Sequence, residues 1–417
     1  MSQQLDVWLH DSTLGDDVLV GSLARAAGRG QEVIRFSYSP AWLASSNKRA
    51  FQIDPELPLT PGAHFPSGGR SLPGIFRDTA PDRWGRVLME RREAMEARQE
   101  ARAPRRLTEW DFLCGVSDQS RMGALRLWDA QRQVPVDDRD LSAPPATRLR
   151  ELEAIVRELE ADDAEDKPEY EQWLRQLVMP GSGLGGARPK ASFVDDAGSL
   201  WLAKFPANDD RHDVGGWELL AHDLAGRAGI DVPEAQQLRF ANPHHTFCVK
   251  RFDRMDGSRR LYCSAMTLLQ RNDGDAGSYL EIAQALQDHG DKDRITPDLA
   301  QLYRRVAFSI VIGNRDDHFR NHGFLRAATG WSLAPAFDIN PNPDKADHAL
   351  AVDEADASPS MATLRATAPY YQLRESQAAA IESEVRNAVV GWQARAKALG
   401  LPQREISLMD QVIDAGR

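Results

Sequence analysis

This sequence has few cysteines, no long apolar run and no excess of positive charge, and each shortage excludes a class of protein. Its three cysteines, Cys114, Cys248 and Cys263, are an odd number without paired spacing, which predicts a reducing compartment and no disulfide framework. No apolar run approaches the roughly 20 residues of a membrane span, and the N-terminus lacks a basic stretch followed by an apolar one. We therefore expect a soluble, cytoplasmic protein with no membrane partner.

The charge balance is acidic. Lys and Arg number 51 against 62 Asp and Glu, which gives a net charge of −11. Such a surface disfavours direct binding to DNA or RNA. The histidines do not fall at zinc-binding spacings, and the pair His244-His245 is interpreted as solvated loop residues. At 417 residues the chain is long enough for two or three domains.

The first region of the chain has the pattern of a small antiparallel sheet followed by a charged helix. Residues 4–10 and 31–38 alternate polar and apolar side chains, which predicts two strands with one wet face. Residues 87–100 carry Glu and Arg at helical spacings. The basic run 102–106 is interpreted as a solvated helix end, with contact to an acidic partner or a phosphate as the alternative. Residues 110–126 return to strand character, and the region ends near residue 140.

A charged amphipathic helix follows a short linker. Residues 147–163 place apolar side chains on one helical face, and the charge run 158–171 is interpreted as solvated surface. The apolar face comprises Leu149, Leu152, Ile155, Val156 and Leu159.

The composition then changes to a glycine-rich stretch, 179–190, which contains Gly181, Gly183, Gly185 and Gly186 and ends at Lys190. Glycine lets backbone N–H groups approach a phosphate, and a nearby lysine adds positive charge. Two strands, 191–194 and 199–205, follow with a turn between them. Protein kinases cover their nucleotide with a glycine-rich hairpin of this kind, although a lone glycine-rich turn is more often structural.

Lys204 ends the second strand of that hairpin, in the setting where kinases hold the lysine that contacts the α- and β-phosphates. A surface lysine on an edge strand is the alternative. A helix is expected over 216–228, with Glu218 in its first turn. Glu218 could pair with Lys204 or could favour the helix N-terminus through the dipole.

Strands are expected at 237–240 and 246–252, followed by Asp253. A kinase presents backbone N–H and C=O to adenine at the corresponding exit between its lobes, and Asp253 would then meet the ribose. The later segments have helical periodicity and predict a mostly helical second lobe: 264–271, 279–289, 297–313 and 377–399.

The stretch 311–321, V-I-G-N-R-D-D-H-F-R-N, follows a buried apolar run and crowds charge into a few residues. Asp316 and Asn321 have the spacing of the kinase catalytic loop, in which Asp accepts the hydroxyl proton and Asn holds magnesium. Asp317 competes for the base role, and only the spacing to Asn321 favours Asp316. Asp338 follows an apolar, strand-like approach, where kinases place a second metal-binding Asp.

These segments together resemble the HipA-like serine/threonine kinases of bacterial toxin–antitoxin modules. The resemblance is carried by G-G-A-R-P-K-A, W-L-A-K-F-P, V-K-R-F-D-R, D-D-H-F-R-N and F-D-I-N-P, and by L-P-G-I-F-R-D-T-A-P-D-R-W-G-R near the N-terminus. It implies an α+β, two-lobed, protein-kinase-like fold with a small β-rich N-terminal subdomain and a mostly helical C-terminal lobe. The expected divisions are an N-terminal subdomain 1–140, a nucleotide-binding lobe 141–255 and a helical lobe 256–417.

The resemblance also implies roles for matching residues, with ATP and Mg²⁺ as cofactors. Asp316 would be the catalytic base, with His318 and Asn321 completing the loop. Asn321 and Asp338 would hold magnesium, and Lys204 would bind phosphates. The other nucleotide-binding positions would be Gly185, Gly186, Ala187, Arg188, Pro189, Lys190, Lys250, Arg251, Phe252 and Asp253.

Family members phosphorylate a protein substrate, such as an aminoacyl-tRNA synthetase, and are neutralised by a helix-turn-helix antitoxin like HipB. This chain would therefore meet DNA only indirectly, through a more basic antitoxin. Several members carry a regulatory serine shortly before the glycine that matches Gly186; Ser182 is one position from the expected site. Two alternatives remain: a small-molecule kinase on the same fold, and a catalytically inactive co-repressor module.

Overall fold

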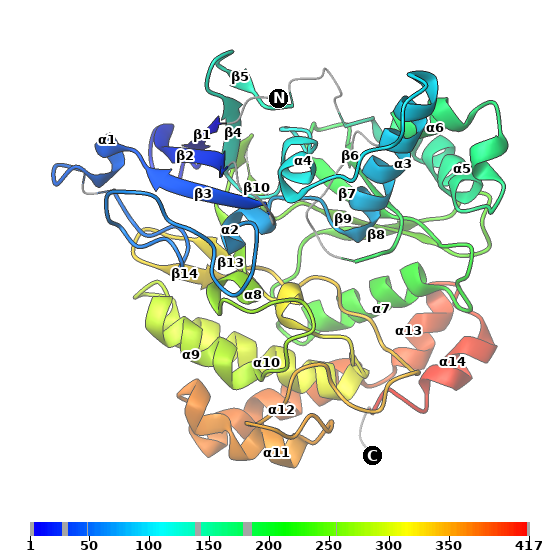
Figure 1. Cartoon of the computed structure of the whole chain (residues 1–417). Helices are drawn as coiled ribbons and strands as arrows, with labels where there is room; N and C mark the ends of the chain where they lie inside the picture. Colours follow the sequence, from blue (N-terminus) through cyan, green and yellow to red (C-terminus); the bar gives the residue numbers. More distant parts are fainter. Residues whose placement is uncertain are drawn as a thin grey trace. The chain divides into compact units, whose positions relative to one another are not determined.

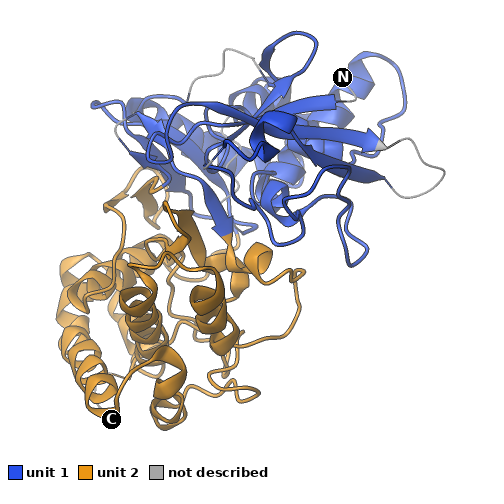
Figure 2. Ribbon diagram, turned by 90° about the vertical axis from the view of Figure 1, so that its left-hand side faces the viewer, with its two compact units in different colours: residues 1–208, 253–263 blue, residues 209–252, 264–417 orange. Residues whose placement is uncertain are grey.

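The computed structural model describes residues 4–26, 32–47, 49–137, 143–177, 186–255 and 257–414. The chain forms two compact units. The first comprises residues 1–208 and 253–263, and the second comprises residues 209–252 and 264–417 (Figure 2). The expected three-part division at residues 140 and 255 does not coincide with these units, because its middle part, 141–255, is divided between them, and it stays a prediction.

The first unit contains a five-stranded antiparallel sheet in the order β3-β2-β1-β4-β5 (Figure 1). Its strands are β1 (Gln4–Leu9), β2 (Val18–Ala26), β3 (Val33–Tyr38), β4 (Leu125–Asp129) and β5 (Val134–Pro135). On β1 and β3, alternate side chains are buried, as the alternation of the sequence predicts.

Strand β2 was missed from the sequence, and its composition explains why. Val18, Leu19 and Val20 run together without alternation, and Gly21 interrupts the pattern. Gly21 is needed because a Cβ atom there would lie 2.2 Å from the carbonyl oxygen of Ser37 on β3. The close approach of the two backbones requires glycine at this position, and that glycine interrupts the alternating pattern from which a strand is predicted.

Helices and two hairpins complete the first unit. The long helix α3 (Arg83–Gln99) begins at Asp82, whose carboxylate accepts a hydrogen bond from the N–H of Gly85. The other elements are α1 (Pro40–Leu43), α2 (Gly74–Arg77), α4 (Glu109–Cys114), η1 (Ala146–Arg148), α5 (Leu149–Leu159), η2 (Ala164–Asp166), α6 (Tyr170–Leu177), β6 (Lys190–Val194), β7 (Leu200–Lys204), β10 (Arg254–Met255) and β11 (Ser258–Arg259).

Three features of this unit agree with the sequence analysis and one corrects it. The apolar face predicted for the amphipathic helix is buried along α5, and β6 and β7 form the predicted antiparallel hairpin. The strand expected from residue 110 is wrong, because a capping box formed by Thr108 and Asp111 begins helix α4 there. The charge run 158–171 is mostly exposed or half-buried, as expected for solvated surface, and it leads into a further helix, α6.

Two arginines of the basic run 102–106 form ion pairs within the first unit. The Arg102 guanidinium lies 2.5 Å from a carboxylate oxygen of Glu93, and Arg105 bridges Glu93 at 3.3 Å and Asp111 at 2.8 Å. These pairs hold the pKa of the Glu93 carboxyl below its ordinary value, with the Arg102 hydrogen bond as the largest cause. The run therefore closes the end of α3 with ion pairs while residues 102–106 stay exposed, which agrees with a solvated helix end.

The second unit is mostly helical and is centred on α10 (Ile295–Ile312), which packs against α9 (Tyr279–His289) and α12 (Glu375–Val389) (Figure 1). The other elements are α7 (Val214–Arg227), β8 (Ala235–Leu238), β9 (Thr246–Lys250), α8 (Ala265–Leu268), η3 (Phe319–Asn321), β13 (Gly323–Arg326), β14 (Trp331–Leu333), α11 (Met361–Ala366), η4 (Ala368–Tyr371), α13 (Trp392–Ala398) and α14 (Gln403–Met409). A short strand, β12 (Tyr262–Ser264), spans the boundary along the chain.

A buried polar cluster fixes the start of α7. Asp213 caps the helix through the N–H of Gly216, at 3.0 Å, and its other oxygen contacts Nδ1 of His245. Glu405 on α14 accepts hydrogen bonds from the Trp217 indole at 2.9 Å and from the Asp213 N–H at 3.0 Å. His245 is therefore buried, and its interpretation as a solvated loop residue is wrong.

Three further expectations for the second unit need correction. Glu218 is the fifth residue of α7 and not part of its first turn. The helix expected over 377–399 breaks into α12 and α13 at Gly391, which has a φ of 78°. The strand-like approach to Asp338 does not form a strand: β14 ends at Leu333, and the Ala336 N–H then donates to the Asp231 carbonyl at 2.8 Å.

Candidate active site

The predicted catalytic loop begins where α10 ends. Gly313 closes the helix in the left-handed region, with a φ of 77°, and a Cβ atom there would lie 2.1 Å from Cγ1 of Val412. Only glycine satisfies both conditions without rearrangement. The chain therefore leaves a rigid, buried helix at a fixed point and enters residues 314–322.

The two adjacent aspartates of this loop have different surroundings. The Asp316 side chain is 60% exposed, and its carboxylate forms an ion pair with the ammonium of Lys345. Asp317 is buried and accepts hydrogen bonds from the Tyr279 hydroxyl at 3.0 Å and the Ser309 hydroxyl at 3.3 Å. Of the two carboxylates, Asp316 is the one that a substrate can reach.

Asp317 is held in its charged form inside the unit. Burial by itself would raise the pKa of its carboxyl, but the imidazole of His322, 3.0 Å away, and the Tyr279 hydrogen bond outweigh burial and keep that pKa below its ordinary value. Because Asp317 and His322 flank residues 318–321, this contact closes the base of the loop. Asp317 is therefore a positioning residue in this structure.

Asn321 and His318 lie in the same loop, and their predicted roles stay predictions. The Asn321 amide nitrogen donates to the carbonyl of Asp316 at 3.1 Å, and the Asn321 N–H donates to the carbonyl of His318 at 2.8 Å. The side chain of Asn321 is buried, whereas His318 is exposed. With its nitrogen used inside the loop, the amide presents its oxygen as the atom that can bind a metal.

Asp338 lies in irregular chain at a φ of 59°, a left-handed conformation that Asp tolerates better than most residues. The preceding residue, Phe337, stacks on Phe252 with ring centroids 5.4 Å apart. Phe252 ends the segment predicted to face adenine, so the structure joins that segment to the residue before Asp338. Sequence distance gave no indication of this contact.

The donor set of Asn321 and Asp338 suits magnesium, which prefers carboxylate and amide oxygens and keeps several waters. Within the described ranges, groups of three or more His, Cys, Asp or Glu that could enclose a metal are absent. A two-residue site of this kind would be completed by substrate phosphates and water.

Lys204 and Lys190 stand opposite each other in the β6–β7 ladder of the first unit, and both are buried. Two ammonium groups at facing positions repel each other. The Lys190 ammonium is neutralised by Asp82, 2.7 Å away, where both side chains are at most 3% exposed, and it also donates to the Gly186 carbonyl at 3.2 Å. These contacts give Lys190 a structural role.

The glycine-rich stretch is described only from Gly186, which has a φ of 94°. Gly185 and Ser182 lie outside the described residues. Ala187, Arg188 and Pro189 connect Gly186 to β6, and Phe205 donates its N–H to the Pro189 carbonyl at 2.9 Å. Their nucleotide-binding roles stay predictions.

The segment predicted to face adenine ends β9 in the second unit. The Lys250 backbone N–H donates to the Glu234 carbonyl at 2.8 Å, and its ammonium lies 3.8 Å from the Glu234 carboxylate. Arg251 is buried. The backbone donor of Lys250 is thus already used, and adenine contact stays a prediction for the remaining positions.

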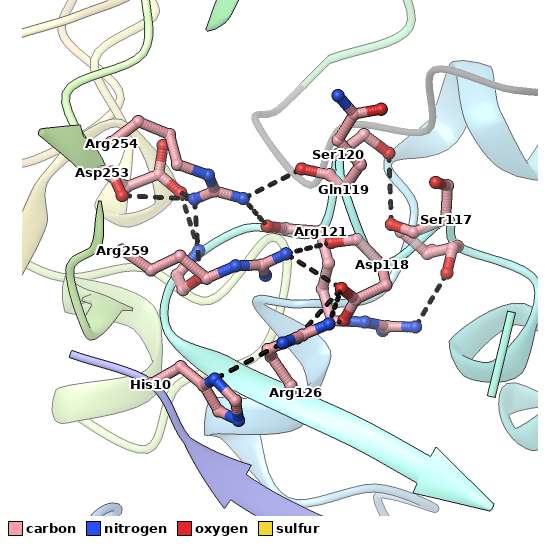
Figure 3. A network of polar contacts seen from close by, with 12 residues as sticks. His10, Ser117, Asp118, Gln119, Ser120, Arg121, Arg126, Asp253, Arg254 and Arg259 are labelled. Atoms are coloured by element: carbon pink, nitrogen blue, oxygen red, sulfur yellow. Dashed lines mark hydrogen bonds and ion pairs between the residues drawn. The ribbon is translucent and has the colours of Figure 1, made fainter. Parts of the chain in front are cut away.

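Asp253 is fully buried in the first unit, where its carboxylate accepts a hydrogen bond from the Gly123 N–H at 2.8 Å and pairs with Arg254 at 2.5 Å. Figure 3 shows Arg254 reaching on to the carbonyls of Gln119 and Arg121, at 3.1 and 2.7 Å. These contacts fasten the segment after β9 to the N-terminal region. They favour a structural role for Asp253 over the predicted contact with ribose.

Three functional neighbours of the loop were missed from the sequence: Tyr279, Lys345 and His348. Tyr279 and His348 lie 38 and 33 positions from their partners in the loop, Asp317 and Arg315. Their contacts arise from tertiary packing, which the sequence does not display.

Acid is expected to destabilise the protein through His348. Burial, assisted by the Arg315 guanidinium, lowers the pKa of His348 from 6.5 to about 4. Between these pH values His348 binds a proton in the unfolded chain and not in the folded chain. The contribution of neutral His348 to the free energy of unfolding is therefore complete above pH 6.5 and is lost toward pH 4. The expected loss is about 2 kcal/mol at pH 5.

Urea unfolding at pH 7 and pH 5 measures this loss as the difference between wild type and His348→Gln, because burial raises the pKa of the Asp54 carboxyl to about 7 and Asp54 shifts the stability of both proteins in the opposite direction. Asp317 does not contribute in this window, because the pKa of its carboxyl lies below 3.8. An equal pH dependence in wild type and variant would show that His348 is not the group responsible.

Comparison with known proteins identifies the family. Residues 182–393 match the HipA-like C-terminal domain, and residues 5–128 match the HipA N-terminal domain. The chain belongs to the HipA-like family. The resemblance inferred from the sequence is thereby confirmed over both halves of the protein.

One solved structure confirms the predicted fold class. The HipA-family chain matches HipA of Shewanella oneidensis MR-1, solved in a complex of HipA, HipB and operator DNA, with a TM-score of 0.67 and 16% identity. That match covers 98% of this chain and 94% of the other. A proinflammatory kinase of Helicobacter pylori, CtkA, matches with a TM-score of 0.43 and 15% identity over 55% of this chain and 88% of that chain.

Among curated proteins, Y4dM of Sinorhizobium fredii, whose name assigns it provisionally to the kinases, is 26% identical over 178 residues. The match spans 39% of this HipA-family chain and 39% of the relative's length.

Within the described parts of the chain, none of the helices combines the length and apolar composition needed to cross a membrane.

Proposed function

We propose that this HipA-family protein is an ATP- and Mg²⁺-dependent serine/threonine protein kinase of the toxin type. The observation that carries the proposal is the loop after α10, where an exposed Asp316 carboxylate stands beside a buried Asn321 that is hydrogen-bonded to its backbone. Family membership and the order of Lys204, Asp316, Asn321 and Asp338 along the chain support it. A catalytically inactive module has no need for all four residues.

The proposed chemistry depends mainly on positioning and charge neutralisation. Asp316 orients a Ser or Thr hydroxyl and accepts its proton. Asn321 and Asp338 hold magnesium, which when bound neutralises charge on the phosphates, and Lys204 contacts the phosphates. Tyr279, Ser309 and His322 keep Asp317 fixed, and that contact holds the loop in place for the reaction.

The proposed partners are a protein substrate and a DNA-binding antitoxin. A HipB-like antitoxin is supported by the solved complex of the Shewanella relative, which contains HipB and operator DNA. A net charge of −11 suits a more basic partner that makes the DNA contact itself. Three buried, free cysteines agree with a reducing, cytoplasmic location.

The test is phosphate transfer from ATP labelled at the γ position, with ATP labelled at the α position as the control. The full chain with Mg²⁺ should label a protein acceptor, or itself, from the γ label alone, and EDTA should stop the reaction. Label on a metabolite and on no protein would favour the small-molecule alternative. Absence of transfer to proteins, metabolites and water would contradict the kinase proposal and favour the co-repressor alternative.

A further inference from the structure

The segment that follows Asp338 returns to the catalytic loop. The Asn342 N–H donates to the Gly313 carbonyl at 2.9 Å, and the Ala349 N–H donates to the Arg315 carbonyl at 3.1 Å. Two hydrogen bonds thus fasten residues 342–349 at both ends to residues 313–315. The connecting turn brings the ammonium of Lys345 onto the carboxylate of Asp316.

This ion pair is not required by the fold. The Lys345 side chain is 48% exposed and that of Asp316 is 60% exposed. Exposed ion pairs contribute little to stability, because water screens the charges and two long side chains lose freedom. The backbone hydrogen bonds at Asn342 and Ala349 already hold the segment, so stability gives no reason for a lysine at this position.

Charge gives such a reason. Phosphoryl transfer places the acceptor oxygen within about 3 Å of the base and the phosphorus about 3–3.5 Å beyond that oxygen. An ammonium paired with the base therefore lies within reach of the transferred group, and its flexible four-carbon chain can turn between the two. Negative charge on the three equatorial oxygens needs a cation there.

We propose that Lys345 is a further catalytic residue, which contacts the transferred phosphoryl group; this inference rests on the proposed kinase function. In the step, the hydroxyl oxygen of the acceptor bonds to the γ-phosphorus, and its proton passes to Asp316. The bond from that phosphorus to the β,γ-bridging oxygen breaks, and ADP leaves with the electron pair. Lys345 stays protonated throughout and supplies charge alone.

A masking role makes the opposite prediction. If Lys345 only covered Asp316 until a substrate arrived, its removal would expose the base and raise the rate. If Lys345 held ATP equally in the ground state and the transition state, its removal would raise KM and spare kcat. A cation that acts on the transferring group instead lowers kcat with little change in KM.

The experiment compares Lys345→Ala, Lys345→Met and Lys345→Arg with Lys397→Ala, an exposed lysine on α13. The full chain is assayed for release or transfer of the γ label from Mg-ATP, and thermal unfolding is recorded for each variant. We expect Ala and Met to lower kcat by about 100-fold, at the lower end of the range for removing one transition-state donor. Arg should recover part of the loss, and Lys397→Ala should behave as wild type.

The outcomes separate the two levels of inference. An active wild type whose kcat is unchanged or raised by Lys345→Ala would overturn the role of Lys345 and leave the kinase proposal standing. A rise confined to KM would also overturn it. A wild-type chain that transfers no phosphoryl group to protein, metabolite or water would overturn both.

Discussion

Asp316→Ala is expected to lower the rate of phosphoryl transfer by about 10²–10⁴-fold, the contribution of a positioned general base. Its exposed carboxylate makes one ion pair, with Lys345, so the free energy of unfolding should change by no more than about 0.5 kcal/mol. Initial rates with γ-labelled ATP and urea unfolding measure the two effects. Loss of activity with retained stability is the expected combination.

Asp317→Ala is the matched control, because it removes the neighbouring carboxylate from the same loop. Asp317 is buried against Tyr279, Ser309 and His322, so its removal leaves polar groups without their partner. The expected loss of stability is about 1–3 kcal/mol. If Asp316→Ala kept wild-type turnover while Asp317→Asn, which preserves shape, abolished it, the assignment of the base would be reversed.

Lys190→Met is expected to lower the free energy of unfolding by about 3–5 kcal/mol, because it removes the ammonium that pairs with the buried Asp82 carboxylate. This is the largest stability effect expected in the first unit. Asp82 also caps α3 through the Gly85 N–H, so loss of the pair reaches the longest helix of that unit. Urea unfolding followed by circular dichroism measures the change.

The double variant Lys190→Met/Asp82→Asn tests the physical cause. Asn removes the buried charge and still accepts the Gly85 hydrogen bond, so most of the lost stability should return. If Lys190→Met instead weakened ATP binding and left stability unchanged, the predicted phosphate contact would be right and the structural role wrong.

Local sequence patterns predicted the residues of the catalytic loop better than they predicted the contacts of the other site residues. The spacing of Asp316 and Asn321 is a short-range property, and the helix before it has a clear apolar period. The role of Lys190 could not be predicted in the same way, because Asp82 lies 108 positions away and a buried lysine in a glycine-rich context has the same local appearance as a phosphate ligand. The buried ion pair with Asp82, not the local spacing, gives Lys190 its structural role.

Asp253 illustrates the same limit. Its position after β9 predicted a ligand contact, yet Gly123, 130 positions earlier, supplies the N–H that its carboxylate accepts. The periodicity of the sequence does not reveal contacts between positions so far apart. Conversely, the capping box of Thr108 and Asp111 was present in the sequence and would have predicted α4.

The most direct test of the account is magnesium-dependent ATP binding, measured as a rise in the thermal unfolding temperature of the full chain. A ligand that binds only the folded state stabilises it by about 2.7 kcal/mol at a concentration of 100 Kd. Asp338→Asn removes the proposed metal ligand's charge and keeps a residue that tolerates the left-handed backbone found there. Asp288→Ala, an exposed position on α9, is the control.

The account predicts a rise in unfolding temperature for wild type and for Asp288→Ala with ATP and Mg²⁺, and its loss in Asp338→Asn. Absence of a rise in wild type, or an equal rise in Asp338→Asn, would contradict it.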